Sequence, residues 1–243
     1  MISLAHPFGR LVLIAPPTAS AGTLAPIESV PPPLPVASLD VLLARLHADE
    51  RALFDALPEA RRPTWLAGRS ALIAALESLG APRQPIASDG RGAPVIAAGF
   101  SGSIAHKPTL AGALAAQFSD AHVGVDVEIL VAPRVNIGSR VLTDAERAEG
   151  GDPAIAVMAR FAIKEAIYKA VDRFVGRYVG FKEAELLDLS MAPSSLIEAP
   201  VFVETRAILT MAQGEGPFVV EASWARAGSF AIAAARVRPK KTA

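Results

Sequence analysis

The stretch RFAIKEAIYKA, residues 160–170, carries the strongest signal for both the fold and the chemistry of this chain. Its apolar residues recur at helical spacing and predict one buried stripe, formed by Ile163, Ala166, Ile167 and Ala170. The same helix carries Lys164, Glu165 and Lys169, which is more charge than a solvent-facing side requires. An ordinary ion pair between Glu165 and Lys169, four residues apart, is one explanation. A site that uses these charges is the other, and the rest of the chain has to separate the two.

The segment HVGVDVEI, residues 122–129, alternates its side chains as a β-strand does. Its three valines face one way, while Asp126 and Glu128 face the other. Two carboxylates on one face repel each other unless they are solvated, paired or bound to a cation. Mg²⁺ prefers such oxygen ligands, commonly one or two carboxylates together with phosphates and water. If the strand packs against the lysine-rich helix, Glu165 can join them, and the lysines can hold phosphate oxygens.

Composition limits the classes of protein to consider. The 243 residues are enough for one large domain or two small ones, and half of them are hydrophobic, which indicates a globular protein. The 24 basic and 24 acidic residues cancel, so the global positive charge of a nucleic-acid binder is missing. The chain has no cysteine, which excludes disulfides, thiolate metal sites and a cysteine nucleophile. Without a secretion signal or a membrane-length apolar run, we expect a cytoplasmic protein.

Helix boundaries are marked by prolines, caps and glycines. The pattern is helical from Leu39 to Leu79, with proline interruptions and a stop at a glycine. A capping box of the Thr-x-x-Glu type starts a later helix, and an Asp-Pro pair starts the 160–170 helix. These boundary residues are Pro58, Pro63, Gly80, Thr143 with Glu146, Asp152 and Pro153. The proline-rich segment 30–36 is expected to be extended or loop-like.

Strands dominate the remaining sequence, and the two halves look alike. Strands are predicted in AELLDLS, VFVETRAIL, FVVEASWAR and SFAIAAARV, between residues 184 and 237. Each half has a long Ala-rich helix and closes on an Ala-rich strand. The fold class is therefore α+β, with two similar α+β lobes over residues 1–120 and 121–243. A cleft between such lobes is a common place for a ligand.

Two motifs together resemble one enzyme family. GVDVE, followed about forty residues later by FAIKEAIYK, resembles the two-part signature of 4′-phosphopantetheinyl transferases. ARRPTWLAGRSALIAAL, GRGAP and GSIAH are similar to the enterobactin-type (surfactin-type superfamily) branch of that family. The likeness covers roughly residues 47–182. Two positions depart from the pattern, Lys107 after His106 and Ser88 where some relatives carry lysine, and both affect the expected nucleotide contacts.

The resemblance implies a fold and a set of site residues. It implies two pseudo-symmetric lobes with coenzyme A (CoA) and Mg²⁺ in a cleft between them. The implied residues for the 3′-phosphate of CoA are Arg61, Arg69 and His106, with Ser103 and Arg91 as further phosphate and adenosine contacts. The implied metal ligands are Asp126, Glu128 and Glu165. The implied catalytic residues are Glu165 as base, Lys169 on the leaving group and Lys164 on phosphate.

The resemblance also implies a reaction and its partners. The 4′-phosphopantetheine group of CoA is transferred to a serine of an apo acyl or peptidyl carrier protein, with release of 3′,5′-ADP. We expect a cytoplasmic, monomeric, Mg²⁺-dependent enzyme without nucleic-acid or membrane partners, and carrier docking on the segment with Arg134, Ile137, Arg140, Val141 and Leu142. Two alternatives stay open: another Mg²⁺-dependent nucleotide phosphotransferase or hydrolase, and a non-catalytic CoA-binding or carrier-docking module.

Overall fold

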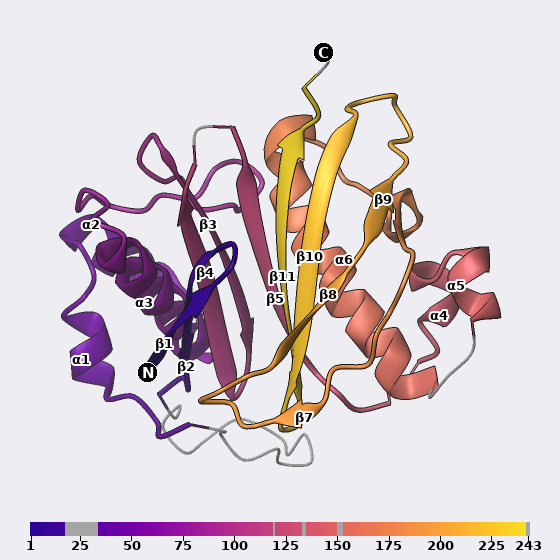
Figure 1. Ribbon diagram of the computed structural model, residues 1–243. Helices are drawn as coiled ribbons and strands as arrows, with labels where there is room; N and C mark the ends of the chain where they lie inside the picture. The colour runs from indigo at the N-terminus through magenta and orange to yellow at the C-terminus, as the bar shows by residue number, and fades with distance from the viewer. Residues whose placement is uncertain (18–33, 119, 133–134, 150–152, 242–243) are drawn as a thin grey trace. The chain divides into compact units, whose positions relative to one another are not determined.

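The computed structural model describes residues 1–17, 34–118, 120–132, 135–149 and 153–241 (Figure 1). The chain divides into two compact units, Met1–Ser119 and Asp120–Ala243, next to the expected junction. Asp152, Arg134 and the start of the proline-rich segment, all named in the sequence analysis, lie outside the described residues. Within the described residues, no helix is both long and apolar enough for a bilayer crossing.

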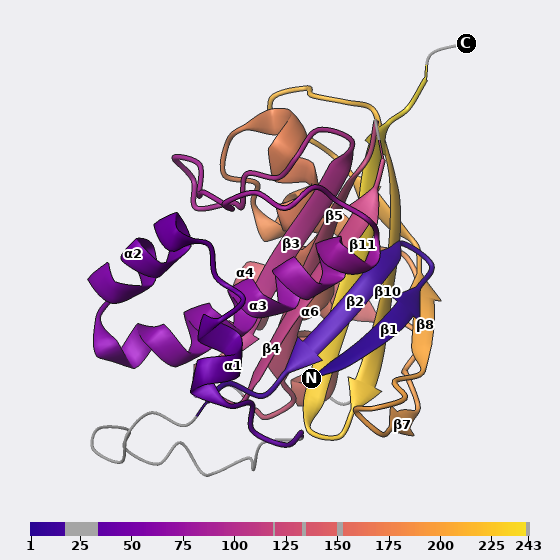
Figure 2. The same cartoon turned by 90° about the vertical axis from the view of Figure 1, so that its left-hand side faces the viewer.

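Unit 1 is a four-stranded antiparallel sheet with one long helix on it. The sheet has the strand order β1-β2-β4-β3, and α3 packs on β2, β3 and β4 (Figure 2). The elements are β1 (Ile2–His6), β2 (Gly9–Ile14), α1 (Leu39–Leu43), α2 (Ala48–Ala56), the 3₁₀ helix η1 (Glu59–Arg61), α3 (Arg62–Ser78), β3 (Phe100–Lys107) and β4 (Leu110–Gln117). Its core is the apolar face of α3 against the inward residues of β2 and β4.

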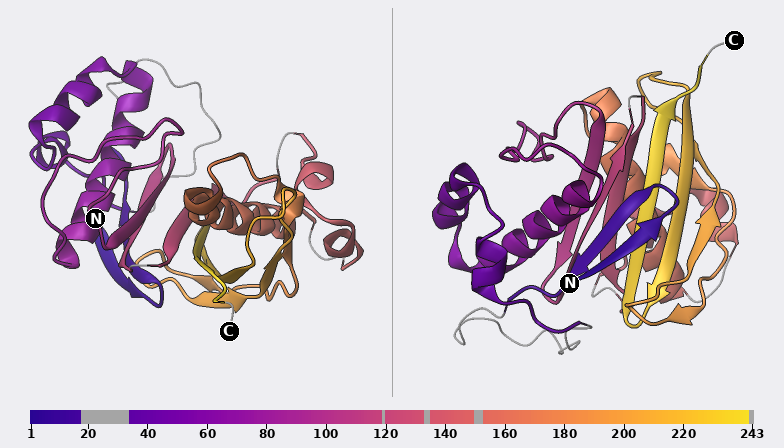
Figure 3. Two further views of the ribbon diagram at one scale, coloured as in Figure 1. Left: turned by 90° about the horizontal axis from the view of Figure 1, so that it is seen from above. Right: turned by 60° about the vertical axis from the view of Figure 1, so that its left-hand side comes forward.

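Unit 2 is a larger sheet with the helix of the opening stretch on one face (Figure 3). Its path is β5-β11-β10-β7, and β8 also pairs with β10, while β6 and β9 form a separate pair. The helices are α4 (Gly138–Val141), α5 (Asp144–Ala148), α6 (Pro153–Val175) and the 3₁₀ helix η2 (Phe181–Glu183). The strands are β5 (His122–Ile129), β6 (Ala184–Leu186), β7 (Ser194–Ser195), β8 (Phe202–Thr205), β9 (Ala207–Leu209), β10 (Phe218–Ala227) and β11 (Phe230–Pro239).

The two units share one internal topology. Unit 1 runs β2, α3, then the hairpin β3-β4, whose second strand pairs antiparallel with β2. Unit 2 runs β5, α6, then β10-β11, whose second strand pairs antiparallel with β5. The expected α+β class with two similar lobes is therefore confirmed, because each unit is one α+β lobe with this order of elements.

Small residues bring the helix of unit 2 close to its sheet. A Cβ added at Gly124 of β5 would lie 1.9 Å from the backbone oxygen of Ala166 in α6. Ala162, Ala166 and Ala170 on the facing side of α6 are fully buried. The Ala-rich composition read in the sequence thus has a packing reason, since larger side chains would push the helix off the strand.

Several expected boundaries are confirmed and others are corrected. α5 begins at the Thr143–Glu146 capping box, and α6 begins at Pro153. Pro63 does not interrupt a helix but lies at the start of α3, where a missing N–H costs nothing. The stretch 201–209 is not one strand, because it divides at Arg206 and its two parts, β8 and β9, pair with different strands.

Candidate functional site

The acidic face of β5 points at α6. The added Cβ at Gly124 would touch α6, so the alternating positions Asp126 and Glu128 face the helix as well. Both carboxylates are buried, with Asp126 6% and Glu128 7% exposed. The strand is buried on both faces, so its acids are not the solvated surface charges that an exposed strand would carry. Burying a carboxylate without a charged or hydrogen-bonding partner costs free energy, so we expect such partners beside Asp126 and Glu128.

Lys169 of α6 is one of those partners. Its Nζ donates to Asp126 Oδ1 at 2.7 Å and to the backbone oxygen of Val125 at 3.0 Å. The Lys169 side chain is about a quarter exposed (26%), so one of its three protons is left to reach another acceptor. Asp126 Oδ2 is buried and has no hydrogen-bond partner among the described residues. An oxygen in that state is suited to a ligand that the chain itself does not supply.

Glu165 lies on the same side of α6, four residues before Lys169, and its side chain is half-buried. The packing of strand on helix that the metal hypothesis requires is therefore present. However, no group of three histidine or acidic side chains within the described ranges is close enough to hold a metal ion. The residues fit a cation that takes one or two carboxylates from β5 and its other ligands from phosphate and water. The three-carboxylate arrangement expected from the sequence is not assembled here.

Lys164 has a different role from the one expected. It is 2% exposed, and its Nζ donates to Glu146 Oε2 at 2.7 Å and to the backbone oxygen of Val141 at 2.8 Å. Burial lowers the pKa of Lys164, and the hydrogen bond and charge of Glu146 oppose that shift. A phosphate contact by Lys164 is not supported, because its ammonium is enclosed and already neutralised by a carboxylate.

Arg69 in unit 1 is likewise buried, at 3% exposure. Its Nη1 donates to the backbone oxygen of Ile86 and lies 3.6 Å from Glu50 Oε1, and its guanidinium carbon is 4.9 Å from the centre of the Trp65 ring. Burial lowers the pKa of Arg69, and the charge of Glu50 opposes the shift. The expected contact of Arg69 with the 3′-phosphate is therefore not supported, since the guanidinium is enclosed by protein.

The other expected nucleotide contacts of unit 1 differ in exposure. Arg61, at the start of α3, is exposed and makes no side-chain hydrogen bond or ion pair with the described residues. His106 is exposed at the end of β3, and Ser103 on the same strand is buried. Arg91 is exposed at the tip of a short turn, where Asp89 Oδ1 accepts the backbone N–H groups of residues 91 and 93 at 2.9 Å. Arg61, His106 and Arg91 are thus accessible to a phosphate.

The structure also describes the two positions that depart from the pattern expected by resemblance, Ser88 and Lys107. Ser88 is exposed and forms an isolated antiparallel β-bridge with Pro94 at the base of the Arg91 turn. Lys107 is half-buried and ends β3.

Sequence reasoning missed a pocket beside α6. It lies within unit 2, and Glu165 lines it. Its other lining residues are Lys164, Ile167, Tyr168, Tyr178, Val179, Gly180, Phe181, Ala184 and Leu209. The ring centroids of two of them, Tyr168 and Tyr178, are 6.0 Å apart. The signal in the sequence was the pair of aromatic segments after the KEAIYK motif, which alone is no different from ordinary core.

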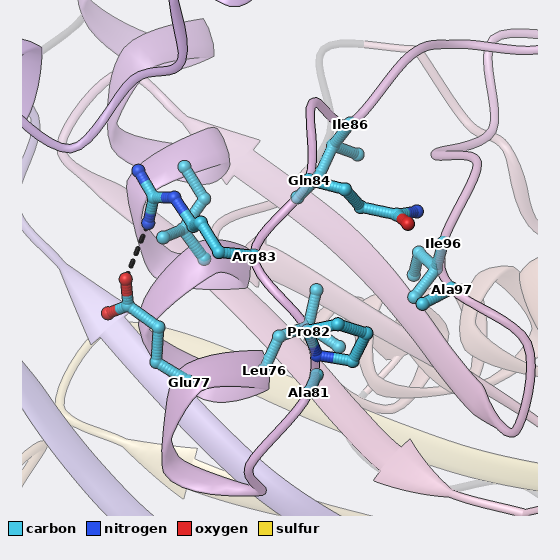
Figure 4. A pocket seen from close by; sticks show the side chains of 10 residues that line it. Leu76, Glu77, Ala81, Pro82, Arg83, Gln84, Ile86, Ile96 and Ala97 are labelled. Carbon is cyan, nitrogen blue, oxygen red and sulfur yellow. Dashed lines mark hydrogen bonds and ion pairs between the residues drawn. The ribbon is translucent and has the colours of Figure 1, made fainter.

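A second pocket lies in unit 1 between the end of α3 and the segment 81–97 (Figure 4). Its walls are mainly apolar, with the Arg83–Glu77 ion pair at the rim (Figure 4). None of the expected site residues lines it.

The expected carrier-docking segment is only partly accessible. Arg140 is exposed and Ile137 is half-buried, but Val141 and Leu142 are buried at 1% and 9%. α4 packs against α6 and η2, so its apolar side belongs to the core of unit 2. Val141 and Leu142 are therefore excluded from a docking surface.

Comparison with known proteins identifies the family of the chain. The model described as the 4′-phosphopantetheinyl transferase N-terminal domain matches residues 49–116, and that of the 4′-phosphopantetheinyl transferase superfamily matches residues 122–215. The 4′-phosphopantetheinyl transferase Npt of Nocardia iowensis is 30% identical over 150 residues, which are 58% of this chain and 66% of that relative. The holo-[acyl-carrier-protein] synthase of Chlamydia pneumoniae is 29% identical over 93 residues, 34% of this chain and 76% of the relative.

Solved structures of acyl-carrier-protein synthases are similar at lower identity. The enzyme of Thermotoga maritima has a TM-score of 0.34 at 22% identity and covers 49% of this chain and 64% of its own. The CoA complex of the Chronobacterium ammoniagenes synthase has a TM-score of 0.37 at 20% identity, covering 50% and 98%. With two family models on the two units, and with the acidic strand and KEAIYK helix inside the second match, the chain belongs to the 4′-phosphopantetheinyl transferase superfamily.

Proposed function

We propose that this protein transfers the 4′-phosphopantetheine group of CoA to a serine of an apo acyl or peptidyl carrier protein and releases 3′,5′-ADP. The observation that carries the proposal is the buried Asp126 on the α6-facing side of β5, with one oxygen paired to Lys169 and the other unpartnered. Family membership gives the reaction class, and the curated relatives are a transferase and a holo-carrier synthase by name. We also propose the enterobactin-type branch, from the N-terminal motifs. Cytoplasmic location and a monomeric state stay predictions.

The reaction balances as a displacement at phosphorus. The carrier serine oxygen forms a bond to the β-phosphorus of the CoA pyrophosphate, and the bond to the bridging oxygen breaks. The bridging oxygen leaves with 3′,5′-ADP. Catalysis of this kind depends mainly on positioning and on neutralising charge.

In this reaction each residue of the proposed site has a defined role. Glu165, half-buried beside the pocket, is the candidate base that accepts the serine proton, directly or through a water. Lys169 offers its remaining N–H to an oxygen of the departing 5′-phosphate of 3′,5′-ADP while it stays paired with Asp126. Mg²⁺, if bound by Asp126 and Glu128 with Glu165 nearby, would supply neutralisation of the pyrophosphate charge. Arg61, His106 and Arg91 remain as the accessible contacts proposed for the 3′-phosphate and adenosine, and the buried Ser103 on β3 remains a further proposed contact.

We further propose that the pocket beside α6 receives the pantetheine arm. The pocket is lined mostly by apolar and aromatic groups, and the pantetheine arm is neutral. Glu165 lines the pocket and lies one helical turn before Lys169, which is paired with Asp126, so an arm in the pocket would direct its phosphate end toward this pair.

The test is intact-mass analysis of apo carrier proteins incubated with this protein, CoA and Mg²⁺. A carrier that gains phosphopantetheine on its serine supports the proposal, and EDTA should abolish the gain. Release of 3′,5′-ADP without a modified carrier would indicate a hydrolase instead. CoA binding without either product, across several carrier classes, would indicate a binding module.

Two variants test the site residues. Asp126→Asn and Glu165→Gln keep size and remove charge, and each should lower kcat by at least ~100-fold while the fold is retained. Asp188→Asn is the matched control, because Asp188 forms an exposed ion pair with Arg206 in the same unit. Normal turnover in both site variants, with lowered melting temperatures, would reduce these acids to structural ones.

A further inference from the structure

Arg177 follows the last residues of α6 and uses every one of its hydrogen-bond donors. Nε donates to Glu215 Oε1 at 2.5 Å and Nη2 to Glu215 Oε2 at 3.0 Å. Nη1 and Nη2 donate to the two oxygens of Glu183 at 3.0 and 2.7 Å. The remaining Nη1 proton goes to the backbone oxygen of Tyr178 at 2.8 Å. A guanidinium with five satisfied donors is held in one geometry.

Glu183 extends this cluster into the neighbouring backbone. Its Oε1 accepts the N–H of Gly180 and its Oε2 accepts the N–H of Ala212, both at 2.8 Å. The Arg177 hydrogen bonds, with opposing burial, hold the pKa of Glu183 and of Glu215 at about 2. Both carboxylates are therefore charged at neutral pH, and the pairing with Arg177 persists there. We call Arg177, Glu183 and Glu215 the arginine clasp.

The arginine clasp acts on the wall of the pocket beside α6. Tyr178, Val179, Gly180 and Phe181 line that pocket, and none of the three clasp residues does. The clasp holds the oxygen of Tyr178 and the N–H of Gly180, which are the backbone groups on either side of Val179. It also ties this wall to the segment after β9 through Ala212 and Glu215.

We propose that Arg177 is a positioning residue that sets the pocket wall against which the pantetheine arm of CoA binds. This inference rests on the function proposed above. Arg177 does not line the pocket; it fixes the backbone of residues 178–180, and so the places of the Tyr178 ring and of Phe181. A free wall would have to be ordered by the ligand, at the expense of affinity.

The alternative is a clasp that only stabilises unit 2. The two differ in which ligand should be affected. CoA carries the pantetheine arm, whereas 3′,5′-ADP carries the nucleotide part without it. A wall that positions the arm matters for the first ligand and not for the second.

The experiment is calorimetric binding of CoA and of 3′,5′-ADP to the full chain. Arg177→Gln should weaken CoA binding by at least ~10-fold, while 3′,5′-ADP binding stays within about twofold of wild type. Turnover at saturating CoA should be largely retained, so that KM rises more than kcat falls. Arg177→Lys, which keeps the charge but not the fork, should fall in between. Arg206→Gln is the control, because Arg206 makes an exposed ion pair with Asp188 and does not line the pocket.

Three outcomes would overturn the inference. They are equal weakening of both ligands, unchanged binding of both with a lowered melting temperature, and a defect in kcat alone. Glu215→Gln, which leaves the Arg177–Glu183 pair intact, serves if Arg177→Gln fails to fold and should shift CoA binding in the same direction. A wild-type protein that does not bind CoA would instead refute the proposed function, so the two failures are distinguishable.

Discussion

Units 1 and 2 each connect a short capped helix to their long helix through one glutamate. Glu50 is the third residue of α2 and accepts the N–H of His47, the residue before the helix, at 2.9 Å. Glu146 is the third residue of α5 and accepts the N–H of Thr143 at 2.8 Å. Each of these buried carboxylates also faces a buried cation on the long helix.

The two pairs differ in how completely they are satisfied. Lys164 donates directly to Glu146 at 2.7 Å, and the other oxygen of Glu146 accepts the N–H of Leu186 at 2.9 Å. Arg69 approaches Glu50 only to 3.6 Å, which is too long for a hydrogen bond. Glu50 Oε1 and Arg69 Nε are both buried without a hydrogen-bond partner in the part of the chain that the structure describes.

The difference follows from the geometry of the two cations. A lysine ammonium on a flexible stem can satisfy a carboxylate and a carbonyl at once. The planar guanidinium of Arg69 donates Nη1 to the Ile86 oxygen and lies over the Trp65 ring, and in this position Nη1 stays 3.6 Å from Glu50 Oε1. The same sequence arrangement therefore yields a closed network in unit 2 and an open one in unit 1.

Removing the cation of the closed network should have the largest effect. Lys164→Met keeps the volume and leaves Glu146 buried without its charge partner, which should lower the free energy of unfolding of unit 2 by about 3–5 kcal/mol. Each unit has one tryptophan, so denaturant unfolding followed by Trp224 fluorescence in a Trp65→Phe background isolates unit 2. The double variant with Glu146→Gln should lose less than Lys164→Met alone. A loss below about 1 kcal/mol would contradict a closed network.

Acid should distinguish the units next. Burial lowers the pKa of His6, in β1 of unit 1, to about 4 from its ordinary 6.5. The neutral ring is favoured in the fold, so its contribution is complete above pH 6.5 and is lost as the pH falls toward 4, by up to about 3 kcal/mol. The carboxylates of the arginine clasp in unit 2 lose their contribution only between about pH 4.5 and 2.

The measurement is hydrogen exchange of β2 and β10 from pH 7 to pH 4. The protection factors of unit 1, which correct for the pH dependence of the intrinsic exchange rate, should fall first, and His6→Asn should remove most of that sensitivity. An equal fall in the protection factors of both units would mean that His6 does not control the acid response of unit 1.

Removing the cation of the incomplete network in unit 1 should have a moderate effect on stability. Arg69→Met leaves Glu50 with its cap hydrogen bond but without a cation, and should lower the stability of unit 1 by about 1–3 kcal/mol. Trp65 fluorescence in a Trp224→Phe background reports it. The same variant tests the phosphate contact, because the preference for CoA over dephospho-CoA should be unchanged if Arg69 is structural. A preference that falls with Arg69→Met would restore the role expected from the sequence.

The caps should give the smallest difference. Thr143→Ala removes an Oγ that accepts the Glu146 N–H, and should cost about 1 kcal/mol. His47→Ala removes an exposed ring nitrogen that accepts the Asp49 N–H, and should cost about 0.5 kcal/mol. Urea unfolding of the two variants, read by the tryptophan of each unit, checks the order. The reverse order would mean that the networks do not depend on their caps.

Local signals in the sequence predicted much of this structure. Period-two alternation located β5 with both of its ends, and the Thr143–Glu146 capping box located α5. Both are properties of neighbouring residues, which the backbone geometry of a strand or a helix start imposes directly. The two motifs also raised the packing of the acidic strand on the lysine-rich helix, which the structure has, but they did not predict the direct pair of Lys169 with Asp126 at 2.7 Å.

Only the tertiary structure decided what each charged side chain does. Lys164 and Lys169 stand in one motif, yet one is enclosed by Glu146 and the other lies at the partly exposed acidic site. Arg69 likewise was expected from the sequence to bind phosphate, whereas the structure surrounds its guanidinium with Glu50 and the Ile86 oxygen. Their hydrogen-bond and ion-pair partners are 17 to 44 residues away in the chain, and burial against such distant groups sets the desolvation and pairing of a charge. A local pattern fixes the face on which a side chain lies, but its surroundings come from the packing of the whole unit.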